Sequence, residues 1–126
     1  CRLPNGLFLH YEDLQGTPVF DHQGGVSFKD VTYKVKAGRA KLYGGLLAEN
    51  VTQAIARIIV AEQMLKMQDA GLRVVMMTHD EVVTCVPVEK AEETCKIMQE
   101  IMSTPPDWAK GYPLNAEGGW DICYSK

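Results

Sequence analysis

The feature that most constrains the fold is the stretch from residue 47 to residue 70, which contains neither glycine nor proline. Apolar side chains recur along it every three or four residues, as on one face of an α-helix. This apolar face consists of Leu47, Val51, Ala54, Ile55, Ile58 and Leu65, with Glu62 as its polar member. Gly71 follows directly and is a typical helix stop. The pattern therefore predicts a helix of about six turns over residues 47–70.

Two short apolar runs follow the predicted helix, at residues 74–77 and 82–86. Runs of this length that are rich in β-branched residues are typical of strands in the core of a sheet. Three ionisable residues stand in succession between them, namely His79, Asp80 and Glu81. The sequence therefore predicts two strands, with the three ionisable residues in the tight connection between them.

The rest of the chain adds two earlier strands and a second helix. Residues 7–12 are predicted to form a strand after a turn at residues 4–6, and residues 28–36 a second one. A helix is expected from Pro87 to Met102, and the tail either packs irregularly or adds a short strand at residues 120–124. The order β-β-α-β-β-α predicts an α+β fold, an antiparallel sheet with two main helices packed on it.

Size and charge narrow the classes of protein to which the chain can belong. At 126 residues it has the length of about one domain. A net charge of −3 argues against a self-sufficient nucleic-acid binder, unless the basic surface belongs to another part of the protein. No long apolar run is present, so no membrane span is expected. The chain begins with Cys1 rather than Met, which favours a processed product or a piece of something longer.

The cysteines point to a reducing compartment. Cys1, Cys85, Cys95 and Cys123 form neither a CxxC pair nor a zinc-binding pattern with histidine. Cys85 and Cys95 lie among apolar neighbours in the sequence and are expected to be buried thiols.

The acidic residues between the two later strands allow two interpretations. Asp80 and Glu81 carry the oxygen ligands that Mg²⁺ prefers, and such an ion can activate and clamp a phosphoryl group. Adjacent residues of an extended chain point to opposite faces, however, so both carboxylates could chelate one ion only with a turn between them. Aspartate is also common at solvated hairpin tips. The residues alone leave a metal site and a solvated turn both open.

A polar stripe borders the apolar face of the long predicted helix. Asn50, Gln53 and Arg57 fall close together around the helix axis. Two amides and a guanidinium in one line can contact phosphates and the acceptors that line a nucleic-acid minor groove. The alternative interpretation is an ordinary solvated helix flank.

Three ordered segments together resemble the C-terminal end of family A DNA polymerases, the bacterial DNA polymerase I type, and most closely phage and viral members. They are "YGGLLAENVTQAIARIIVAEQML", "THDEVVTCVP" and "PPDWAKGYPLNAEGGW". The segment "RLPNGLFLHYE" resembles the hairpin before the long helix in that family. The resemblance covers nearly the whole chain, and His79-Asp80-Glu81 occupies the place of the family's motif C.

The resemblance implies roles for individual residues. Asp80 is similar to one of two palm aspartates that bind the catalytic Mg²⁺ ions, with His79 and Glu81 as its partners near the primer terminus. Gln53 is similar to the helix glutamine that contacts the minor groove of the primer-template, and Arg57 lies one turn further on. Asn50 departs from the pattern, because some members place an asparagine four residues before the glutamine and here it is three before.

The resemblance also implies what this chain lacks. Residues 1–126 would be the C-terminal portion of a palm domain, without fingers, thumb or the first acidic motif. Two-metal nucleotidyl transfer, with Mg²⁺ as cofactor, would then require primer-template DNA, dNTPs and the N-terminal remainder of the polymerase, on the same or a separate chain. The isolated chain is expected to be inactive, and the compartment would be the cytoplasm, that of the host if a phage encodes the chain.

Other origins and functions remain open. The chain could be a natural subunit of a split polymerase, and Cys1 is one of the residue types that protein splicing requires after an intein. A palm-like module that binds a partner without chemistry is a second class of function. A compact Mg²⁺-dependent nuclease is disfavoured, because nucleases gather several acids and this chain offers one cluster.

Overall fold

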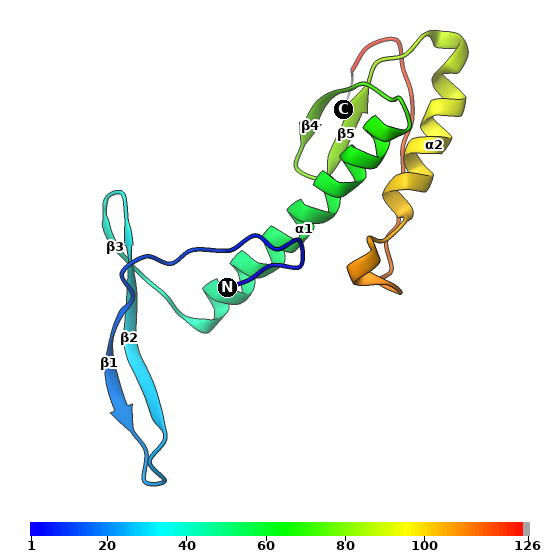
Figure 1. Ribbon diagram of the computed structural model, residues 1–126. Coiled ribbons are helices and arrows are strands. Elements are labelled where there is room, and N and C mark those ends of the chain that lie inside the picture. Colours follow the sequence, from blue (N-terminus) through cyan, green and yellow to red (C-terminus); the bar gives the residue numbers. More distant parts are fainter. Residues whose placement is uncertain (125–126) are drawn as a thin grey trace. The chain divides into compact units, whose positions relative to one another are not determined.

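The computed structural model describes residues 1–124 and has the predicted α+β class. Its strands are β1 (Gln15–Phe20), β2 (Val26–Val35), β3 (Gly38–Lys41), β4 (Val74–Thr78) and β5 (Glu81–Thr84), and its α-helices are α1 (Gly44–Asp69) and α2 (Ala91–Ser103). The strands form two antiparallel sheets, of three and two strands, instead of one. The chain divides into two compact units, residues 1–55 and the residues from Ala56 onward (Figure 1).

The first unit contains the three-stranded sheet β1-β2-β3, in which each strand pairs with the next. The predicted strand at residues 28–36 is confirmed as β2, and a bulge interrupts its pairing with β1 between Gln15 and Thr17. The predicted strand at residues 7–12 is wrong. That segment forms the isolated bridge Arg2↔Phe8, because the turn at residues 4–6 folds it back on the first residues of the chain. Further along, the Glu12 carbonyl accepts a backbone hydrogen bond from the Lys34 N–H of β2 at 2.9 Å.

Helix α1 confirms the predicted long helix, beginning three residues earlier and ending one residue earlier. Its C-terminus is closed by two backbone bonds, from Leu72 N–H to the Met67 carbonyl and from Gly71 N–H to the Gln68 carbonyl, both 2.9 Å. This pair of bonds is the Schellman motif, which needs a left-handed residue after the helix. Gly71 supplies it with φ +79°.

Gly71→Ala is expected to lower the free energy of unfolding by roughly 1–2 kcal/mol, the cost of a Cβ in the left-handed region. Urea unfolding followed by circular dichroism measures it. Gly44→Ala is the matched control, because a Cβ there meets no atom within 4 Å and alanine favours the helix. Equal effects of the two substitutions would contradict the proposed role of Gly71.

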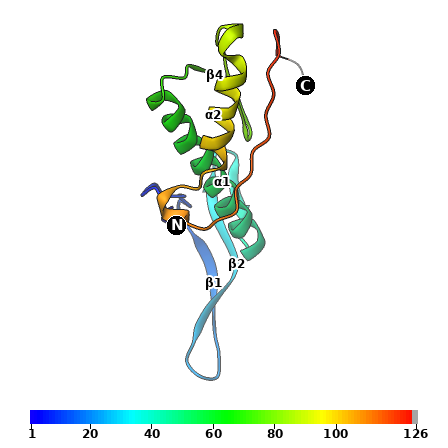
Figure 2. The same ribbon diagram turned by 90° about the vertical axis from the view of Figure 1, so that its right-hand side faces the viewer.

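The second unit packs the later part of α1 against the β4–β5 hairpin and α2 (Figure 2). Its buried centre is formed by Val60, Met67 and Val82, with partly buried apolar residues of all three elements around them. The buried amide of Gln63 donates to the Met102 carbonyl at 2.6 Å, which joins α1 to the C-terminal end of α2 without leaving a buried polar group unpaired.

The predicted apolar face of α1 is corrected at Leu47, which is 37% exposed, and in the last turns of the helix. Leu65 is 59% exposed, whereas Gln63 and Met67 are buried, so the buried face is rotated in the last turns of the helix. Glu62, the polar member of the predicted face, accepts a hydrogen bond from the Trp108 indole at 2.9 Å. A tryptophan from the tail thus provides a hydrogen-bond donor for the one polar residue on the predicted apolar face.

The remaining differences concern the cysteines and the tail. Cys85 is exposed and Cys95 half-buried, so the expected burial of the Cys85 thiol is wrong. The predicted second helix begins with a 3-10 turn at Val88–Lys90 before α2. Residues 120–124 form no strand and follow the irregular alternative. Within residues 1–124, no helix is both long enough and apolar enough to cross a membrane.

Candidate functional site

The three ionisable residues His79, Asp80 and Glu81 lie at the tip of the β4–β5 hairpin, and we call them the acidic tip. Thr78 and Glu81 form the last cross-strand pair, so His79 and Asp80 make the two-residue connection and Glu81 is the first residue of β5. Two-residue hairpin turns require positive φ at the first central position, which glycine or asparagine usually supplies. Here His79 adopts φ +55°. The strained histidine therefore holds Asp80 at the exposed apex, and such strain is concentrated at functional sites.

The carboxylates at this tip have different environments. Asp80 is exposed, whereas Glu81 is half-buried and its Oε2 accepts a hydrogen bond from the Tyr124 hydroxyl at 3.1 Å. Asp80 belongs to the two-residue turn, and Glu81 follows it directly as the first residue of β5. Within residues 1–124, no three His, Cys, Asp or Glu side chains gather closely enough to hold a metal ion. The oxygen donors suit Mg²⁺ in kind, but a full coordination shell needs ligands beyond this hairpin.

Beyond the bond from Trp108 to Glu62, hydrogen bonds tie the C-terminal tail to the same unit at further points. The Ala116 N–H donates to Ser103 Oγ at 3.2 Å, and the Gln99 amide donates to the Gly118 carbonyl at 3.2 Å. A further point is the bond from Tyr124 to Glu81. We call residues 111–124 the C-terminal strap. No pattern in the sequence indicates the contacts of this strap, because the residues that they join lie between 13 and 43 positions apart.

The three residues of the predicted polar stripe have separate surroundings. The Asn50 amide is half-buried and donates to the Tyr11 hydroxyl at 3.0 Å. Gln53 is exposed, and its amide donates to Glu49 at 3.1 Å one turn earlier on the helix. Arg57 is exposed and reaches Met77 Sδ on β4 at 2.8 Å. The structure thus brings Arg57 to the strand that leads into the acidic tip.

A curated phage protein is similar to nearly the whole chain. The chain is 45% identical over 130 residues to a DNA polymerase of Bacillus phage SP02, an alignment that covers 99% of this chain and 19% of that relative. No family model matches the chain, and no solved structure matches it. The chain therefore resembles a segment of a phage DNA polymerase and spans about a fifth of that relative's length.

Proposed function

We propose that this chain is the C-terminal palm segment of a family A DNA polymerase and contributes one half of a two-metal site for nucleotidyl transfer. The observation that carries the proposal is 45% identity to a phage DNA polymerase along nearly the whole chain. The exposed Asp80 at a strained hairpin tip supports it, since a catalytic carboxylate must be accessible to substrate. Residues 1–126 would then form part of one palm domain.

In this proposal each residue of the acidic tip has a different role. Asp80 provides the accessible carboxylate that holds Mg²⁺, and Glu81 is oriented beside it by the Tyr124 hydroxyl. His79 fixes the turn and lies near the primer terminus in this proposal. When bound, two Mg²⁺ ions lower the pKa of the primer 3′-hydroxyl and stabilise the departing pyrophosphate.

The exposed donors of helix α1 would contact the primer-template. Gln53 carries an exposed amide and Arg57 an exposed guanidinium, one turn apart on the same helix. Such donors suit the minor groove, whose acceptors are present at every base pair, and they hold a duplex without selecting its sequence. Asn50 contributes less, because its amide is half-buried, unlike that of Gln53, and donates to the Tyr11 hydroxyl.

The remainder of the polymerase would complete the site. A single carboxylate binds Mg²⁺ weakly, and residues 1–124 gather no third ligand. The second metal-binding aspartate, the grip on the incoming dNTP and much of the basic DNA-binding surface therefore come from the other part of the enzyme. We expect the isolated chain to be inactive.

Primer extension with Mg²⁺ and four dNTPs tests the proposed function. The chain is assayed alone and mixed with the part of the phage SP02 polymerase that lies outside the matched segment. Extension in the mixture alone is expected. Extension by the isolated chain would contradict the claim that the second metal-binding aspartate comes from the other part of the enzyme. Duplex binding without extension in the mixture would favour a non-catalytic palm-like module.

Tyr124→Phe is expected to lower primer extension about fivefold in the completed enzyme, since one hydrogen bond to a carboxylate is worth about 1 kcal/mol at an exposed position. The Mg²⁺ concentration for half-maximal rate should rise, because Glu81 is less well oriented. Tyr112→Phe is the control, removing the hydroxyl of an exposed tyrosine elsewhere in the tail. Identical Mg²⁺ titrations for both variants would show that the strap does not orient the acidic tip.

A further inference from the structure

The β2–β3 hairpin concentrates the positive charge of the first unit. Residues 29–41 contain five basic side chains and one acidic side chain, Asp30, although the net charge of the whole chain is −3. No role for this hairpin follows from the acidic tip or from helix α1. Its charge therefore calls for a separate explanation.

The strand register places three of these basic residues on one face of the sheet. Lys34 pairs with Arg39 and Thr32 pairs with Lys41, so the side chains of both pairs share a face. The Arg39 guanidinium confirms the arrangement, because its Nε donates to Thr32 Oγ1 at 3.0 Å. We call Lys34, Arg39 and Lys41 the basic face.

Like charges directly opposite each other destabilise an antiparallel pair, so Lys34 beside Arg39 needs a compensating charge. Asp13 compensates Arg39 with an ion pair of 2.6 Å, and the hydrogen bond from Arg39 lowers the pKa of the Asp13 carboxyl. Among residues 1–124 this is the one ion pair on the basic face. Lys34 and Lys41 remain exposed with their charge available to an anion from outside the chain.

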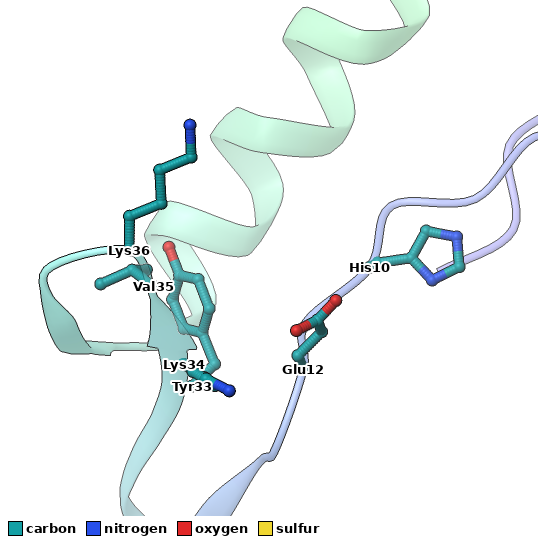
Figure 3. A pocket seen from close by; sticks show the side chains of 6 residues that line it. All are labelled: His10, Glu12, Tyr33, Lys34, Val35 and Lys36. Carbon is teal, nitrogen blue, oxygen red and sulfur yellow. The ribbon is translucent and has the colours of Figure 1, made fainter.

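An open pocket of about 500 Å³ adjoins the basic face at the end of β2. Its lining residues are His10, Glu12, Tyr33, Lys34, Val35 and Lys36. Figure 3 shows Tyr33 and Lys36 extending from the end of β2 toward the same side, while His10 and Glu12 come from the N-terminal segment. The ammonium groups of Lys34 and Lys36 suit phosphates, and the Glu12 carboxylate suits a hydroxyl or amino donor. A nucleotide carries both kinds of group.

We propose that the basic face and this pocket bind the phosphodiester backbone of DNA, as a contact surface made of residues other than those of the acidic tip and of helix α1. The inference rests on the proposed function, which makes DNA the polyanion that the protein meets. Phosphate contacts of this kind position a protein on DNA without reading its sequence, and they release counterions. The contribution of the basic face is therefore measurable as a salt dependence.

Fluorescence anisotropy of the chain with a labelled 20-base-pair duplex and a labelled 20-nucleotide single strand tests the proposal between 50 and 200 mM salt. Lys34→Gln with Lys41→Gln should raise Kd about tenfold and reduce the slope of log K against log salt by about 1.8 on the duplex, or about 1.4 on the single strand. The slope identifies which form the site binds. Lys90→Gln with Lys110→Gln is the control, since both lysines are exposed and the change in net charge is the same.

Equal weakening by the two double variants would overturn the proposal, because net charge alone would then govern binding. Displacement of DNA by poly-glutamate at the same charge concentration would also overturn it, since that polyanion has no phosphate. This test can fail while the chain still completes a polymerase, and primer extension can fail while the basic face still binds DNA. The two proposals are therefore distinguishable.

Discussion

Asp80→Asn is expected to reduce primer extension by the completed polymerase at least about 10³-fold. In the proposed function this carboxylate, at the exposed apex of the β4–β5 hairpin, would supply the charge that holds Mg²⁺, and the neutral amide could not replace it. Loss of several kcal/mol of transition-state stabilisation by the metal corresponds to a loss of this size. Single-turnover extension rates at saturating dNTP measure the effect.

The control for this variant is Asp69→Asn, which removes the same charge from an exposed position at the end of α1. It should leave the extension rate unchanged. Primer-template affinity of Asp80→Asn should remain close to that of the unmodified protein, because the donors of α1 are intact. Wild-type extension by Asp80→Asn would show that the acidic tip does not carry the chemistry.

Met67→Ala is expected to lower the free energy of unfolding by about 3 kcal/mol, within the usual range of roughly 2–5 kcal/mol for a fully buried large residue. Met67 has 0% exposure and lies at the centre of the second unit, against Val60 and Val82. Its truncation removes apolar contacts and leaves a cavity between α1 and the hairpin that carries the acidic tip.

Urea unfolding of Met67→Ala and of Leu65→Ala compares the free energies of unfolding after truncating a buried and an exposed residue of the same helix. Leu65 is 59% exposed, so its truncation should change the free energy of unfolding by less than about 0.5 kcal/mol. A loss for Met67→Ala that is no larger than for Leu65→Ala would contradict the packing of α1 described here.

The elements predicted correctly from the sequence are those with a strong local signal. Helix α1 follows from helical spacing and from a glycine stop, and the structure shows that Gly71 closes the helix for the expected reason. The β4–β5 hairpin follows from two apolar runs around three ionisable residues, although Glu81 belongs to β5 instead of the connection and β5 ends at Thr84 instead of residue 86. In both cases local propensity and tertiary packing favour the same structure.

The elements missed depend on pairing with another strand. β1 contains Gly16 and Pro18, which argue against a strand, yet an edge strand tolerates proline and β1 pairs with the longer β2. β3 has no β-branched residue and forms because it continues the hairpin from β2. Short segments of this kind take their structure from the neighbouring strand, so their own sequence carries little signal.

The position of the three ionisable residues on a hairpin was predicted more accurately than the contacts that surround them. The sequence predicted the acidic tip, and the structure places His79 and Asp80 in the turn and Glu81 at the start of β5. It did not predict that Arg57 reaches β4 or that Tyr124 reaches Glu81. Both contacts join residues far apart in the chain, and their positions depend on how α1, the hairpin and the strap pack together.

Exchange of segments between this chain and its phage relative tests the central proposal most directly. The matched segment of the phage SP02 DNA polymerase is replaced by residues 1–126, and primer extension by the chimera is measured with Mg²⁺ and four dNTPs. We expect extension within about tenfold of the parent rate, a difference below about 1.4 kcal/mol in the barrier, and its loss with Asp80→Asn. A folded chimera that binds primer-template but does not extend it would contradict the assignment of this chain as a polymerase palm segment.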